Sequence, residues 1–62
     1  MLPYALLWAG ICIAHVCFPV KVDTLPNVEE CIPNIAGQIA HNYAYKHHAT
    51  LLEWSCQEER GL

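Results

Sequence analysis

The first twenty residues form the most apolar part of the chain. Residues 2–20 contain no Asp, Glu, Lys or Arg. The run is apolar at every position around a helical turn, which favours a helix surrounded by apolar material over a helix with one solvated face. We therefore expect residues 1–20 to form a hydrophobic N-terminal helix.

Three interpretations of this segment follow, and a cleaved export signal is the one we favour. Small residues at Cys12 and Ala14 permit a cut after Ala14, and cuts after Cys17 or Phe18 fit less well. An uncleaved membrane anchor is the alternative, although the proline-free residues 4–18 span only about 22 Å as helix, against about 30 Å of bilayer core. The third interpretation is a helix packed on the rest of a soluble protein.

The remainder of the chain divides into a connector and a second helix. Residues 21–34 are a polar connector with Pro26 and Pro33 and a short helical turn, and residues 59–62 are a tail. Residues 35–58 carry apolar side chains at helical spacing, which predicts one amphipathic helix. Its apolar arc is the candidate interaction face and comprises Ile35, Ile39, Tyr43, His47, Leu51 and Trp54. The predicted fold is thus small and all-α.

The composition limits the partners that the chain can bind. The net charge is −3, from six acidic and three basic residues. The bases Lys21, Lys46 and Arg60 are widely spaced, so they form no basic patch and nucleic acid is not an expected partner.

The four cysteines raise the question of a disulfide. If residues 1–17 are removed, Cys31 and Cys56 remain as a candidate pair. On one continuous helix these two residues would lie about 37 Å apart, so a bond between them requires the chain to fold back. The alternative is two unrelated thiols.

No catalytic or metal site is expected. The spacings among His41, His47 and His48 do not match the three- or four-residue spacing with which a helix chelates a metal ion. The chain has one serine, Ser55, and no glycine-rich phosphate loop. About 40 residues outside the apolar run leave little room for a water-excluding pocket. We expect no enzyme activity and no cofactor.

The sequence is compatible with two functions. The first is a small secreted polypeptide, without enzyme activity, that binds a protein partner through its amphipathic helix. The alternative is a single-pass membrane protein, anchored by residues 2–20, that binds a larger membrane complex or the membrane surface. Self-association is compatible with both.

Overall fold

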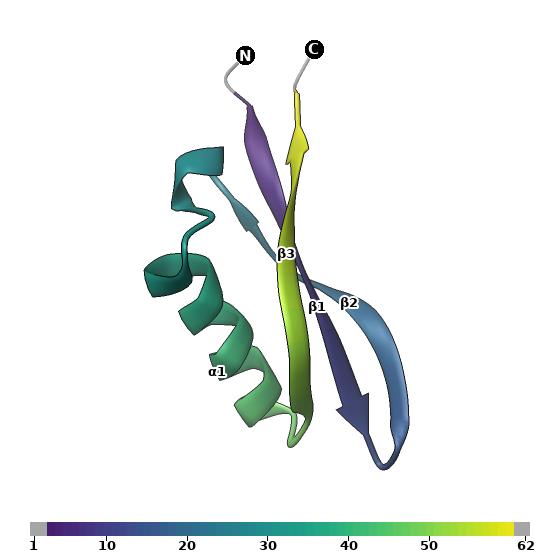
Figure 1. Ribbon diagram of the computed structural model, residues 1–62. Helices are drawn as coiled ribbons and strands as arrows, with labels where there is room; N and C mark the ends of the chain where they lie inside the picture. The colour runs from purple at the N-terminus through teal and green to yellow at the C-terminus, as the bar shows by residue number, and fades with distance from the viewer. Residues whose placement is uncertain (1–2, 61–62) are drawn as a thin grey trace.

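The protein is a three-stranded antiparallel sheet with a helical segment on one face (Figure 1). The computed structural model describes residues 3–60. The strands are β1 (Tyr4–Ile13), β2 (Val16–Leu25) and β3 (Thr50–Glu59), and their order in the sheet is β2-β1-β3. Between β2 and β3 the chain forms a 3-10 turn, η1 (Val28–Glu30), a π-helical turn, η2 (Pro33–Gly37), and α1 (Gln38–Lys46).

The predicted all-α fold is therefore wrong, beginning with the N-terminal helix. Residues 4–20, expected as a signal or anchor helix, form the central strand β1 and the first half of β2. β1 carries apolar residues on both faces although only one face packs against the helical segment, so the strand lacks the apolar–polar alternation that identifies a half-exposed strand. Within residues 3–60, no helix is long and apolar enough to cross a membrane.

The predicted helix over residues 35–58 is also wrong in its second half. The helical segment ends at Lys46, and residues 50–59 are β3 instead. His48 has a φ of 55°, and its N–H donates to the carbonyl of Tyr45, while the N–H of Ala49 donates to Ala44. These two bonds form a Schellman motif, which ends the helix with a left-handed residue. The tail expected at residues 59–62 is partly strand, since β3 includes Glu59, and residues 61–62 lie outside the described part.

The hydrophobic core lies between the sheet and the helical segment. Alternate residues of β1 are buried there, and they meet alanines spaced four residues apart on the helical side. Small side chains at this spacing let the helix approach the sheet closely. The buried apolar residues are Ala5, Leu7, Ala9, Ile11, Leu25, Ala36, Ala40 and Ala44.

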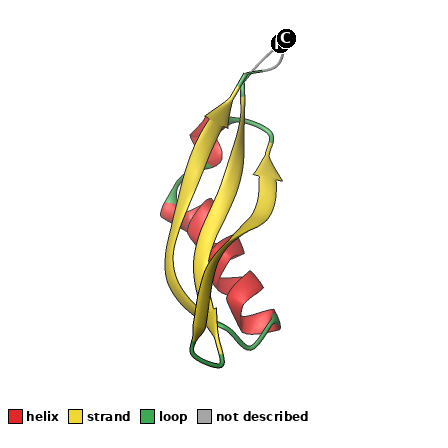
Figure 2. Ribbon diagram, turned by 90° about the vertical axis from the view of Figure 1, so that its right-hand side faces the viewer, coloured by secondary structure: helices red, strands yellow, loops and turns green. Residues whose placement is uncertain are grey.

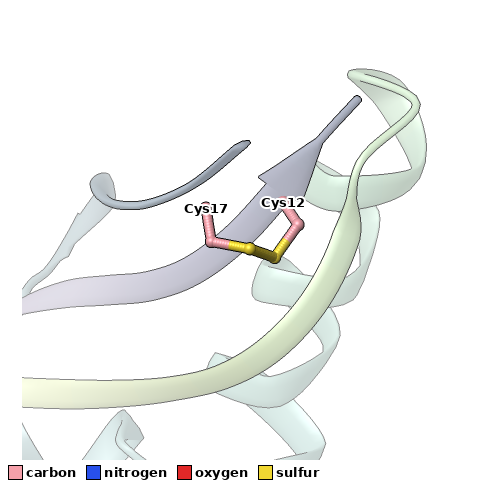
Figure 3. The surroundings of a disulfide bond; sticks show 2 residues. All are labelled: Cys12 and Cys17. Atoms are coloured by element: carbon pink, nitrogen blue, oxygen red, sulfur yellow. A yellow bond between two sulfur atoms is a disulfide. The ribbon is translucent and has the colours of Figure 1, made fainter. Parts of the chain in front are cut away.

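Two disulfides connect the elements. Cys31–Cys56 joins the segment between η1 and η2 to β3, with the Cα atoms 6.2 Å apart. The expectation of a disulfide bond is confirmed, and the chain does fold back as such a bond requires. Cys12–Cys17 joins directly paired residues of β1 and β2 and is a second bond that was not predicted from the sequence (Figure 3).

Candidate functional site

The face of the sheet opposite the helical segment is covered by no other element in residues 3–60 (Figure 2). Because side chains alternate along a strand, the residues of β1 between the buried ones point to this side. Its central stripe is apolar and runs along β1 through Tyr4, Leu6, Trp8, Gly10 and Cys12. We call this side, with the paired residues of β2 and β3, the open face.

Trp8 lies at the centre of the open face. It pairs with Lys21 on β2 and with Ser55 on β3. Its indole Nε1 is buried yet has no hydrogen-bond partner in the described residues. Neighbouring Gly10 contributes no side chain, and the side chain of Glu53 lies over it, with its Cγ 3.5 Å from the position that a Cβ of Gly10 would take. An apolar stripe with a large aromatic residue at its centre is a common feature of protein interfaces.

The two flanks of the open face carry opposite charge. Lys21 lies on the β2 side, level with Trp8, and Glu53 lies on the β3 side, level with Gly10. The only salt bridge within residues 3–60 joins Arg60 and Glu58, so neither flanking charge has an ionic partner there. By the strand register, the open face therefore has a basic edge formed by Lys21 and an acidic edge formed by Glu53, while Asp23 of β2 pairs with the core residue Leu7 and lies outside this face.

A second exposed apolar surface lies at the end of the β1–β2 hairpin, which reaches past the last turn of α1 (Figure 1). Val16 is 62% exposed, Phe18 39% and Ile13 38%. We call these three side chains the hairpin tip. A two-residue turn connects the strands there, with both Ala14 and His15 at positive φ, 51° and 70°.

The disulfide Cys12–Cys17 braces the tip. It joins the residue pair next to the Ile13–Val16 pair that closes the turn, and its Cα atoms are 3.9 Å apart (Figure 3). Positive φ is unfavourable for Ala14, so a covalent bond one pair away supports a turn that the turn residues themselves do not favour. The tip is thus an apolar surface on a constrained backbone.

A shallow open hollow of about 500 Å³ lies beside this disulfide. Its lining brings residues of the hairpin end together with the start of β3 and comprises Cys12, Ala14, His15, Cys17, His48 and Thr50. Within residues 3–60, no group of three or more His, Cys, Asp or Glu is arranged to hold a metal ion. All four cysteines are in disulfides, so none is a free thiol nucleophile.

The six residues of the predicted interaction face do not form a helical face. Four of them lie on the helical segment or at its end, but Leu51 and Trp54 lie on β3. Trp54 and Ile39 pack against the buried cluster, so these two side chains stabilise the fold from inside the protein. Tyr43 contacts His47, with ring centroids 4.4 Å apart, and Ile35 is half-buried.

Neither exposed surface was predicted from the sequence, because both belong to the segment that was expected to be a helix. Trp8, Val16 and Phe18 were part of an apolar run, and nothing in that run indicated which side chains would face solvent. The paired cysteines on either side of Ala14-His15 were the available signal for a hairpin.

Comparison with family models, curated proteins and solved structures found no match for the chain.

Proposed function

We propose that the chain is a small secreted polypeptide, without enzyme activity, that binds a protein partner through its hairpin tip. The observation that carries this proposal is the exposure of three apolar side chains, Ile13, Val16 and Phe18, at the end of a disulfide-braced hairpin. A constrained backbone lowers the entropy lost when such a surface is immobilised by a partner.

Two disulfides in a chain of 62 residues support an extracellular location. Disulfides persist in oxidising compartments, and small secreted domains use them to compensate for small cores. The proposed form keeps residues 4–20, since their removal would take away β1, which pairs with both other strands.

The test is a binding measurement with Val16→Asp, because a carboxylate at the most exposed position of the tip must be desolvated when a partner covers it. Fluorescently labelled oxidised protein is titrated onto cells of the source tissue or culture. We expect saturable binding that is lost after proteolysis of the cell surface, and a loss of about tenfold or more in affinity for Val16→Asp.

Leu52→Asp is the matched control. Leu52 is 60% exposed and lies on β3, at the position where the register with β1 shifts. Leu52→Asp adds the same charge as Val16→Asp and removes slightly more apolar surface, but it leaves the tip intact, so binding should be unchanged. Equal losses for both variants would contradict a contact at the tip. Binding that survives proteolysis and is reproduced by phosphatidylcholine vesicles would replace the protein partner with a membrane surface.

A further inference from the structure

The sheet is packed on only one side, because no other element of residues 3–60 covers the open face. Five of the eight buried apolar residues are alanines, so the core beneath the helical segment buries few large side chains. Leu6 and Trp8 on the other side of β1 are only half-buried. In a chain of this size, association is a common way to bury more apolar surface.

The edges of the sheet are poorly suited to pairing with another strand. Pro19 in β2 has no N–H to donate, and the register between β1 and β2 shifts at Val22. β3 has a corresponding shift at Leu52 and carries three glutamates. Charges, prolines and bulges at edge strands prevent edge-to-edge pairing. A partner of the sheet should therefore stack on the open face.

We propose that this partner is a second copy of the chain, packed face to face about a two-fold axis parallel to β1. Such an axis places β2 of each copy over β3 of the other. The basic edge of one copy then lies over the acidic edge of its partner, and Lys21 and Glu53 form two symmetric pairs between the copies. Stacked sheets lie about 10 Å apart, a gap that long Lys and Glu side chains can bridge.

A second two-fold axis can lie in the plane between the stacked sheets, but the arrangement that it produces is electrostatically unfavourable. A two-fold axis perpendicular to the strands would stack β2 on β2 and β3 on β3, which brings the lysine edges together and the glutamate edges together. The charges thus select the axis parallel to β1. In that arrangement the two Trp8 indoles meet at the centre, where aromatic rings prefer offset stacking.

The dimensions of the face suit a small interface. Three strands of ten residues cover roughly 33 by 14 Å, about 460 Å² per copy, which is below the roughly 800 Å² per partner of a standard interface, so the dimer should be weak and reversible. The dimer is a two-sheet sandwich with a helical segment on each outer side. Both hairpin tips then project from the same end, so the dimer presents the proposed partner contact twice. Only this last consequence rests on the proposed function.

The test is a charge exchange followed by sedimentation equilibrium on the oxidised full chain. Wild type is expected to dimerise reversibly in the micromolar range. Lys21→Glu or Glu53→Lys alone makes both symmetric contacts repulsive, and we expect dimerisation to weaken about tenfold. The double variant Lys21→Glu/Glu53→Lys restores opposite charges across the interface and should recover most of that loss.

Two controls keep the outcomes distinct. Lys46→Glu changes the same charge at the end of α1, and Val16→Asp changes the tip, so neither should alter dimerisation. Circular dichroism and thiol titration verify that each variant is folded and oxidised. A wild-type chain that stays monomeric up to about 1 mM overturns the proposal. Dimerisation that the double variant fails to recover also overturns it, because the paired charges would then not face each other. Neither result bears on binding at the tip.

Discussion

Gly37 packs against the indole of Trp54 where the helical segment meets the sheet. It is buried, with φ −61° and ψ −41°, so its backbone is helical and needs no glycine. A Cβ added there would lie 3.4 Å from Nε1 of Trp54, which is an ordinary van der Waals contact. We expect Gly37→Ala to raise the free energy of unfolding by about 0.5–1 kcal/mol, since alanine loses less backbone entropy in a helix.

Urea unfolding monitored by circular dichroism measures this gain. Gly37→Val is the companion variant, because its branched side chain extends into the indole of Trp54 and should destabilise the protein. A lower stability for Gly37→Ala would contradict the ordinary contact between the added methyl group and Trp54.

At the scale of elements, the sequence indicated the first part of the helical segment and the need for a chain reversal between Cys31 and Cys56. Residues 21–34 were expected to be a connector, but residues 21–25 form the second half of β2. It did not indicate the strands. β1 is apolar on both faces because one face packs in the core and the other forms the open face, so periodicity cannot distinguish it from a buried helix. The turn Ala14-His15 lacks the Gly, Asn or Asp that usually identifies a tight hairpin.

The end of α1 was missed for a related reason. His48 takes the left-handed position that glycine normally occupies in a Schellman motif, so the sequence has no glycine to end the helix there. Trp54 and Leu51 happen to fall on the helical arc of Ile35 and Ile39. Their actual position is on β3, and Trp54 still faces the helical segment across the core. Neither the open face nor the hairpin tip could be predicted, because both depend on the strands of the sheet and on which side of β1 the helix covers.

The two disulfides should contribute unequally to the stability of these elements. Cys31–Cys56 closes a separation of 25 residues and Cys12–Cys17 one of 5. By loop entropy, replacing the first pair with serine should cost about 3.5 kcal/mol and replacing the second about 2 kcal/mol. Urea unfolding of the two double-serine variants checks the order. A larger loss for the hairpin pair would mean that the braced turn organises the sheet more than the long loop does.

For the whole molecule, the fold makes the N-terminal apolar segment indispensable. β1 lies between β2 and β3, contributes four of the buried residues and supplies Cys12. A mature form beginning after Ala14 would lose this strand and leave Cys17 without its disulfide partner.

We therefore expect the protein isolated from its native cell to contain residues 4–13, with both disulfides formed. Intact mass measured before and after reduction and alkylation checks both statements, since all four cysteines should be alkylated only after reduction. A mass that lacks residues 1–14 would contradict this fold for the mature protein, and free thiols in the native sample would contradict the oxidising compartment on which the proposed function rests.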